Sequence, residues 1–285
     1  MAPPARSPRT TRAAGPGRRV PVARTLLAAA VGLVMLLPLY WMVLTAFSPL
    51  TDLYSADLHW WPTAPTLRNF RTVLALPTGT WLMNSVVVTV CVVALTVTVN
   101  LLAGYVFAKT RFRGRNTLFL VLVSTMTVPL QVLMVPQFKM VGSLGMFGTF
   151  WAVILPAASA TFGIFLARQF MLAIPDEVIE AARCDGAGQI RTFVSVVLPL
   201  SKPLIAVLSL LTFLNQWNDF AWPLTVLKDH DLYTLSVGLL FLQGQYTSDY
   251  GAIMALALIS VLPMVVIFLC FQRYFVQGFA RSGIK

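Results

Sequence analysis

Hydrophobic residues gather in long runs along this chain, and short polar segments separate the runs. A transmembrane helix needs about 20 mostly apolar residues to cross the hydrocarbon core of a bilayer. Six runs meet this length, at residues 25–47, 82–108, 117–137, 150–171, 203–223 and 251–271. Prolines such as Pro129 and Pro136, or polar residues, interrupt the third and fifth runs, so their ends are less sharply defined. The pattern predicts an all-α polytopic membrane protein with six transmembrane helices.

The first run follows Arg18 and Arg19, an arrangement that also occurs in secretory signal peptides. Its apolar stretch is longer than the ~7–15 residues of a signal peptide, and no small-residue cleavage site follows it. We therefore expect this segment to be retained as a helix. Residues 1–24 are rich in Pro, Arg, Ala and Gly and cannot bury a core, which predicts a disordered basic tail.

The composition agrees with a membrane protein. Charged residues make up 11% of the 285 residues, hydrophobic residues make up 58%, and the mean hydropathy is +0.78. A soluble globular domain carries about 25% charged residues. The shortfall excludes a large soluble core and places the bulk of the chain in a bilayer.

Lysine and arginine fall unevenly on the two sides of the predicted spans. Of the 21 basic residues, 17 lie before the first run, in the segments 109–116 and 168–202, or after the last run. The opposite side keeps only Arg68, Arg71, Lys139 and Lys228. Because loops rich in Lys and Arg stay cytoplasmic, both termini are predicted to be cytoplasmic. The net charge of +11 is then a topology signal, and nucleic-acid binding is not needed to explain it.

The predicted organisation has three parts. The disordered basic cytoplasmic tail covers 1–24, and the six-helix transmembrane domain covers 25–275, with a cytoplasmic loop at about 172–202. A cytoplasmic C-terminal tail covers 276–285.

The cytoplasmic loop carries an unusual charged segment between two apolar runs. Pro175 suits the first position of a helix, where its missing N–H costs nothing. Asp176 and Glu177 follow in the first turn, where the helix dipole favours negative charge. A helix to Arg183 would have an apolar face made of Val178, Ile179, Ala181 and Ala182. The pattern predicts a short amphipathic helix.

Two glycines, Gly186 and Gly188, follow this helix and are expected to end it, since glycine adopts the left-handed cap conformation at little cost. A second helical piece is expected from about Gln189 to Leu198, ending at Pro199. Two interpretations fit the residues. The segment is either an amphipathic linker on the lipid headgroups or a docking helix for a partner protein.

The stretch EAARCDGAGQIRTFVSVVLPLSKP resembles the EAA loop of permeases of ABC importers. The residues that match its pattern are Glu180, Ala181, Ala182, Asp185, Gly186, Ala187, Leu198 and Pro199. Other stretches are similar to permeases of the maltose type, which import carbohydrates: TLRNF, WLMNS, VPLQVLMVP, LARQFMLAIP, WNDFAWPL and FVQGF. The likeness covers the chain from about residue 25 onward and leaves out the basic tail.

The resemblance implies a multi-pass permease of the bacterial cell membrane with several partners. These are a second homologous permease, two copies of a cytoplasmic ATPase and an extracytoplasmic solute-binding protein. ATP and Mg²⁺ would bind to the ATPase. This chain is expected to hold no cofactor, and its sequence has no phosphate-binding loop of the form G-x-x-x-x-G-K-S/T.

In this family the EAA helix docks into a cleft of the ATPase and couples nucleotide-driven closure to the transport pathway. The resemblance assigns that coupling role to Glu177, Glu180, Ala181, Ala182, Arg183, Asp185, Gly186 and Ala187. The end of the chain resembles family tails that contact the ATPase pair, which assigns a second contact to Phe279, Arg281 and Lys285.

Polar residues inside the predicted spans are candidates for a substrate pathway, because polar groups are costly in lipid. The candidate pathway residues are Asn215, Asn218, Asp219, Trp217 and Gln131. Sugars bind planar polar groups and stacking aromatic rings, but a polar clamp between helices fits the same residues. Gln137, Asn84, Ser85 and Asn100 leave the same two alternatives open.

The sequence lacks the marks of other functional classes. Its cysteines (Cys91, Cys184, Cys270) and histidines (His59, His230) have no disulfide or metal-ligand spacing, so no metal site is expected. No nucleophile elbow, HExxH motif or paired carboxylates indicate an enzyme. The main hypothesis is a permease subunit of an ATP-driven sugar importer. The alternatives are an importer of glycerol-3-phosphate or its diesters and an ion-coupled secondary transporter, for which only Asp219 offers a membrane acid.

Overall fold

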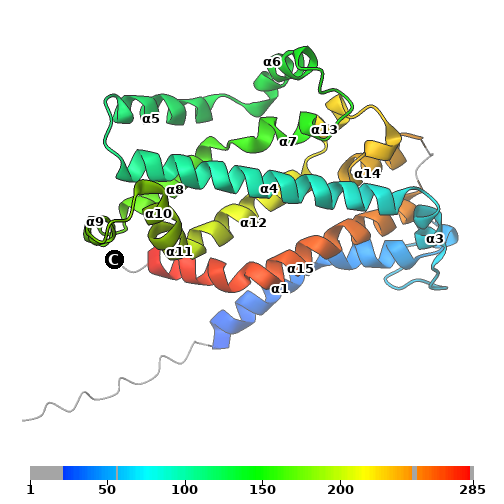
Figure 1. Ribbon diagram of the computed structural model, residues 1–285. Coiled ribbons are helices and arrows are strands. Elements are labelled where there is room, and N and C mark those ends of the chain that lie inside the picture. The colour runs from blue at the N-terminus through cyan, green and yellow to red at the C-terminus, as the bar shows by residue number, and fades with distance from the viewer. Residues whose placement is uncertain (1–21, 56, 246–248, 283–285) are drawn as a thin grey trace, which may run out of the picture. The chain divides into compact units, whose positions relative to one another are not determined.

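The computed structural model describes residues 22–55, 57–245 and 249–282 (Figure 1). Every regular element in these residues is helical, which confirms the all-α expectation for them. The chain divides into two units, Met1–Trp41 and Met42–Lys285, with the boundary inside the first long helix. The expected disordered tail at 1–24 lies outside the described residues except for its last three positions.

The first long helix, α1 (Val22–Phe47), is apolar throughout and contains Pro38. Its last turn belongs to the second unit and is buried there. Asn69 of α3 (Arg68–Leu74) donates hydrogen bonds to the carbonyls of Ala46 and Ser48, at 3.0 and 2.9 Å. Between them lies the short helix α2 (Leu50–Leu53). These bonds satisfy the carbonyls that the end of α1 leaves without partners.

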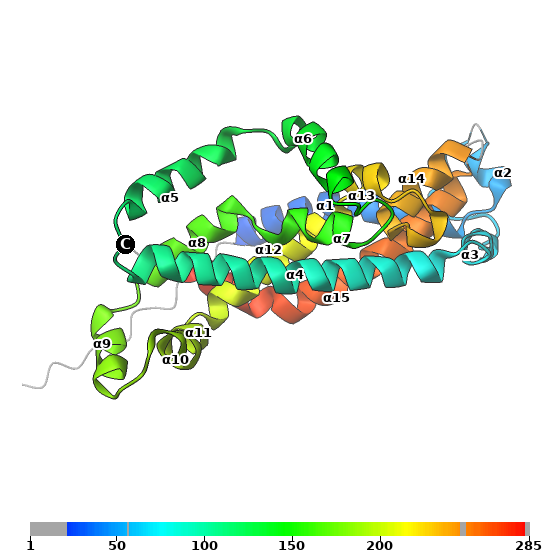
Figure 2. The ribbon, with the colours of Figure 1, turned by 45° about the horizontal axis from the view of Figure 1, so that its top comes forward.

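Four helices form the core of the second unit. The 32-residue helix α4 (Thr78–Lys109) packs against α8 (Thr161–Leu172) and α12 (Lys202–Asn218), and α12 packs against α15 (Tyr250–Ser282) (Figure 2). Buried apolar side chains from α4, α8 and α12 make one cluster with the loop at 172–202, and α12 and α15 share another with α3 and the end of α1. This core positions the two sites predicted from the sequence, which are the proposed coupling loop and the proposed substrate pathway.

Three helices among the described residues are long and apolar enough to cross a membrane alone: α1, α4 and residues 250–272 of α15. Three bent pairs of helices, at 115–143, 151–172 and 189–218, could each form one further span, so the described residues hold up to six spans. The six-span count and the cytoplasmic termini therefore stay predictions.

The largest bend lies in the third predicted span. Helix α5 (Arg115–Ser124) with the 3₁₀ turn η1 (Thr125–Thr127) meets α6 (Leu130–Ser143) at 105°. Val128 is extended, with ψ 118°, because the residue before a proline disfavours the helical region. The interruption expected at Pro129 is therefore present, and the segment predicted over 117–137 is two helices that meet at this bend.

The fourth and fifth predicted spans are also bent. Helix α7 (Trp151–Ile154) with the 3₁₀ turn η2 (Pro156–Ala158) meets α8 at 40°. Helix α12 ends at Asn218, and the chain resumes in α13 (Ala221–Val226). The predicted span over 203–223 is thus two helices, with Asp219 and Phe220 between them.

The N-terminal half of α4 holds the loop at 230–235 in place through polar side chains. Trp81 and Asn84 donate hydrogen bonds to backbone carbonyls between His230 and Tyr233, and the Ser85 hydroxyl accepts one from the N–H of Leu235. The distances lie between 2.7 and 2.9 Å. The loop contains η4 (His230–Leu232) and leads into α14 (Leu235–Gln245).

The middle of α4 holds the break before α8 in a similar way. Thr96 donates to the carbonyl of Ala157 at 2.6 Å, and the side-chain oxygen of Asn100 lies 3.4 Å from the N–H of Ala160. Polar residues on α4 therefore satisfy backbone groups of bent segments. This favours a helix-contact role over a pathway role for Asn84, Ser85 and Asn100.

The last helix runs further than expected. α15 continues as a helix to Ser282, so the tail predicted from 276 begins as an extension of the last span. Its end lies at the same end of the second unit as α9 and the end of α4 (Figure 1). Lys285 and the side chains of Phe279 and Arg281 lie outside the described residues, so their proposed contact stays a prediction.

Candidate functional site

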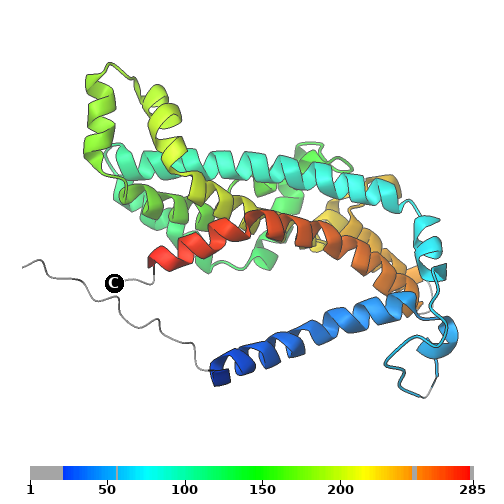
Figure 3. The same ribbon diagram turned by 90° about the horizontal axis from the view of Figure 1, so that it is seen from below.

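The loop predicted to be cytoplasmic, at about 172–202, folds into a hairpin of short helices that projects from the bundle near the end of α4 (Figure 3). Its first arm is α9 (Asp176–Cys184). Asp176 and Glu177 occupy the first turn, as expected. Pro175 is the N-cap residue, with ψ 137°, and not the first helical residue. This one-residue difference leaves the predicted charge pattern at the start of the helix unchanged.

α9 is exposed over most of its surface. Ile179 is its one buried side chain, at 4% exposure. Val178 and Ala181, predicted on the same apolar face, are exposed, and Ala182 is half-buried. One apolar anchor is little for a segment of this length, so α9 presents its remaining surface outward.

The residues to which the resemblance assigns the coupling role lie together on this arm and the turn that follows it. Exposed among them are Glu177, Glu180, Ala181, Arg183, Asp185 and Gly186, whereas Ala182 and Ala187 are half-buried. The surface combines acids, one base and small side chains. Small side chains let a partner approach closely, and the charges can pair with opposite charges on it.

A Schellman motif ends α9. The N–H of Ala187 bonds to the carbonyl of Ala182, and the N–H of Gly186 bonds to the carbonyl of Arg183, each at 3.0 Å. Gly186 has φ 81°, the left-handed conformation that this motif requires and that glycine adopts most readily. Gly188 has φ −66° and is the N-cap of the next helix, so the expectation that it also ends α9 is wrong.

The second arm consists of α10 (Gln189–Thr192), a π-helical turn η3 (Phe193–Val197) and α11 (Leu198–Leu200). The arm continues through Pro199, where a stop was expected. Pro199 lies in the first turn of α11, where a missing N–H is tolerated. The bend follows at Ser201, before α12.

The hairpin is tied to the core by apolar and polar contacts. Ile179, Phe193 and Val197 join the cluster of α4, α8 and α12. The ring centroids of Tyr105 and Phe193 lie 5.1 Å apart. These contacts connect the second arm to α4 directly.

Lys109, the last residue of α4, contacts the start of the first arm. Its ammonium group donates to the carboxylate of Asp176 and to the carbonyl of Ile174. The hydrogen bond and the positive charge of Lys109 lower the pKa of Asp176 below its usual value, and Arg111 and Arg183 add to the effect. Asp176 is therefore a stable carboxylate at neutral pH.

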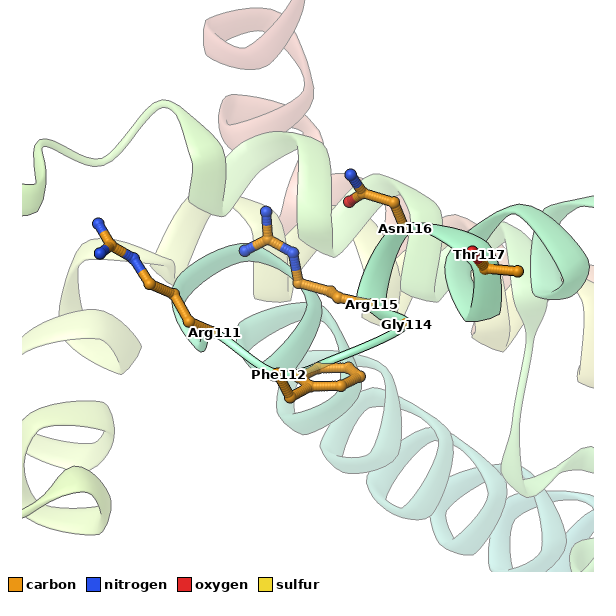
Figure 4. A pocket seen from close by; sticks show the side chains of 6 residues that line it. All are labelled: Arg111, Phe112, Gly114, Arg115, Asn116 and Thr117. Atoms are coloured by element: carbon orange, nitrogen blue, oxygen red, sulfur yellow. The ribbon is translucent and has the colours of Figure 1, made fainter.

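The loop between α4 and α5 and the first turn of α5 line an open surface pocket of about 330 Å³ (Figure 4). Its lining residues are Arg111, Phe112, Gly114, Arg115, Asn116 and Thr117. Arg111 and Arg115 extend to the same side in Figure 4, and Phe112 points away from them. The pocket adds positive charge at the predicted cytoplasmic end, where anionic lipid headgroups lie.

The candidate pathway residues do not share one environment. Asn215 and Asn218 are exposed on α12, and Gln131 is exposed on the separate helix α6. Asp219 is half-buried between α12 and α13, and its carboxylate lies 3.5 Å from the N–H of Trp222. The carboxylate of Asp219 thus faces the start of α13.

Trp217 differs from the expectation of a stacking surface. Its side chain is 3% exposed, and its indole N–H donates to the carbonyl of Ser260 at 3.1 Å. The indole also stacks on Phe213 at 5.3 Å. With its ring covered, Trp217 clamps α12 to α15 and offers no face to a sugar. Its neighbour Trp222 is buried too and donates to the carbonyl of Ala152 at 2.9 Å.

No group of His, Cys, Asp and Glu residues able to hold a metal ion occurs in the part of the chain that the structure describes. The exposed surface of α9 and of the turn after it combines small side chains with solvated charges. Such an arrangement suits the docking of another protein.

Comparisons with known proteins match this architecture. Residues 100–281 match the family model of the binding-protein-dependent transport system inner membrane component. The arabinooligosaccharides transport system permease protein AraQ of Halalkalibacterium halodurans is 36% identical, over 90% of this chain and 93% of that protein. AraQ of Bacillus subtilis is 32% identical, over 93% of this chain and 95% of that protein.

A relative with a different cargo is also similar. The sn-glycerol-3-phosphate transport system permease protein UgpE of Escherichia coli is 33% identical, over 87% of this chain and 92% of that protein. A crystal structure of a bacterial ABC transporter involved in the import of the acidic polysaccharide alginate contains a chain with the same fold. The TM-score is 0.80 at 22% identity, over 89% of this chain and 95% of that one. The chain therefore belongs to the family of binding-protein-dependent transport system inner membrane components, which are multi-pass proteins of the bacterial cell membrane.

Proposed function

We propose that this chain is a permease subunit of an ATP-driven importer and that it carries a sugar or oligosaccharide. The main support for the proposal is the exposure of α9. This charged helix has a single buried apolar side chain and lies outside the core of an otherwise apolar protein. A short helix with so little buried surface is only marginally stable alone, so packing against a partner would stabilise it. We infer that this partner is a soluble ATPase.

The proposed complex contains this chain, a second homologous permease, two ATPase subunits and an extracytoplasmic solute-binding protein. ATP and Mg²⁺ bind to the ATPase subunits, so ATP hydrolysis is not an activity of this chain. The end of α15 lies at the same end of the second unit as α9, which supports a second contact of the C-terminal tail with the ATPase.

A neutral sugar is the favoured cargo. The proposed outer side carries few bases, and Arg68, Arg71 and Lys139 are exposed. Lys228 lies over the ring of Phe147, at 5.5 Å from its centroid. A phosphate ester is usually held by converging basic groups. The relatives that carry arabino-oligosaccharides also agree with a neutral cargo.

Glycerol-3-phosphate is the second candidate cargo, because the glycerol-3-phosphate permease is 33% identical over most of its length. One experiment distinguishes the two candidate cargoes. The complex is purified with its solute-binding protein, and binding of arabinotriose and of glycerol-3-phosphate to that protein is measured by calorimetry.

Uptake of the bound compound into proteoliposomes is then followed with and without ATP. The proposal expects binding of arabinotriose and uptake that requires internal ATP. Binding of glycerol-3-phosphate alone would replace the cargo and keep the architecture. Uptake driven by a pH gradient without ATP would contradict the proposed function.

A further inference from the structure

Lys109 joins three elements at the end of the second unit where the coupling helix lies. It is the last residue of α4, and its ammonium group donates to the carbonyl of Ile174 at 2.6 Å and to the carboxylate of Asp176 at 2.5 Å. Ile174 follows the end of α8, and Asp176 is the first residue of α9. One side chain therefore connects the ends of α4 and α8 to the start of the coupling helix.

The burial of Lys109 distinguishes this contact from an ordinary surface ion pair. The side chain of Lys109 is 5% exposed, whereas that of Asp176 is 71% exposed. A buried ammonium group is unfavourable unless it is paired and hydrogen-bonded. An uncharged side chain at 109 would also leave the carbonyl of Ile174, a buried residue, without this donor.

Other charges face Asp176 without replacing this bond. Arg111 and Arg183 act on its carboxylate by charge alone, whereas Lys109 acts by charge and by a hydrogen bond. Lys109 and Ile179 thus attach the first arm of the hairpin to the core. Without Lys109, α9 would lose this polar contact and would be held by the buried side chain of Ile179 and by its packing against the second arm of the hairpin.

Helix α4 also contacts the second arm of the hairpin and the loop at 230–235 through other side chains. One turn before Lys109, Tyr105 packs against Phe193 of the second arm. At the N-terminal half of the same unbroken helix, Trp81, Asn84 and Ser85 hold the loop at 230–235. A displacement of the coupling helix that moves the end of α4 would reach this loop along one rigid element.

We propose that Lys109 is a positioning residue that makes the coupling helix α9 and α4 move as one body. The proposal rests on the proposed function, since it concerns how motion of the ATPase enters this chain. It assigns to a lysine outside the EAA pattern the task of keeping α9 attached while the ATPase subunits close and open.

The test measures the separation of α9 and α4 in the complete complex in lipid nanodiscs. Nitroxide labels are placed on the native Cys184, at the end of α9, and on Val106→Cys, an exposed position in the last turns of α4. Cys91 and Cys270 are replaced by serine. Pulsed EPR distances are recorded without nucleotide and after trapping with ATP and vanadate.

With Lys109 present, we expect one narrow distance distribution that trapping leaves unchanged. Lys109→Met should broaden the distribution and make it shift on trapping, and Lys109→Arg, which keeps a charged donor, should restore the narrow one. Asp176→Asn, at an exposed position, gives a second variant that does not depend on tolerance of the buried site. Arg113→Met is the matched control. Arg113 is an exposed base in the loop that follows α4, and its variant should give the distances of the unmodified chain.

The outcomes separate this inference from the proposed function. If the ATPase assembles and both Lys109→Met and Asp176→Asn give the unmodified distances in both states, the inference is wrong and the proposed function stands. If the complex that carries Lys109→Met does not assemble, the distances measured with Asp176→Asn decide whether the inference holds. If no ATPase assembles with the unmodified chain, the proposed function fails and the inference falls with it.

Discussion

Gly104 of α4 lies directly against Ala167 of α8. A Cβ atom at position 104 would meet the methyl group of Ala167 at 2.5 Å and backbone atoms of Ala167 and Arg168 at 3.0 Å. The two helices therefore approach closely because residue 104 has no side chain, as is common where membrane helices pack. This crossing places the end of α4 beside the segment that leads into α9.

Gly104→Ala should destabilise the protein, because backbone atoms cannot move aside as a flexible side chain can. Overpacking of this kind costs about 1–3 kcal/mol. The measurement is thermal unfolding of the purified chain in detergent. Gly79→Ala, on the same helix with nothing within 4 Å of the added atom, is the control and should leave the midpoint unchanged or raise it slightly, since alanine favours a helix more than glycine does. Equal midpoints for both variants would show that the crossing is looser than the structure indicates.

Gly186→Ala should impair coupling without preventing membrane insertion. The left-handed conformation at 186 costs a residue with a side chain about 1 kcal/mol or more, although the added atom meets nothing within 4 Å. The turn after α9 would therefore change, and ATP hydrolysis stimulated by the loaded solute-binding protein should fall.

Gly188→Ala supplies the matched control for the turn. Gly188 lies two residues away in equally open space but has an ordinary φ of −66°. Its variant should retain full stimulation. Equal stimulation in both variants would mean that docking does not depend on the Schellman turn.

Trp217→Phe should lower stability and leave the uptake rate per folded complex unchanged. The change removes the hydrogen bond to the carbonyl of Ser260, which is worth about 1 kcal/mol, and keeps most of the aromatic packing. Thermal unfolding and uptake are measured on the same preparation. A lower uptake rate with an unchanged unfolding midpoint would return Trp217 to the transport pathway.

Asp219→Asn should keep expression and assembly but slow uptake. Asparagine retains a side-chain oxygen that can accept the N–H of Trp222, so the start of α13 should persist while the negative charge is lost. Asn218→Ala is tested beside it, because Asn218 is exposed and bonds only to its own helix, at Leu214. If both variants transport normally, the segment is a structural clamp and the pathway lies elsewhere.

Local features of the coupling segment were predictable from the sequence. Asp176, Glu177 and Gly186 act through helix-end preferences that depend on a few neighbouring residues. The exposure of α9 also followed from its charge. Gly188 was misjudged because glycine is compatible with both a helix end and a helix start, and only the backbone angles distinguish them.

Bends and contacts between residues far apart in the chain were harder to predict from the sequence. Pro129 indicates that a helix is interrupted, but a bend of 105° depends on what the two halves pack against. Trp217 fits a sugar-stacking surface and a helix clamp equally well until its partner Ser260 is known. Lys109 was counted only as a topology signal, because its contact with Asp176 joins positions 67 residues apart.

We propose that α9 docks on a separate ATPase, and site-specific photocrosslinking in the complete complex tests this contact. Benzoylphenylalanine is placed at the exposed position of Ala181 on α9, and at Leu67, an exposed position on the predicted outer side, as the control. The complex is irradiated in native membranes, and the crosslinked partners are identified by mass spectrometry. We expect a crosslink from position 181 to the ATPase subunit and none from position 67. A co-purifying ATPase that never crosslinks to position 181, or crosslinks only to lipid there, would contradict it.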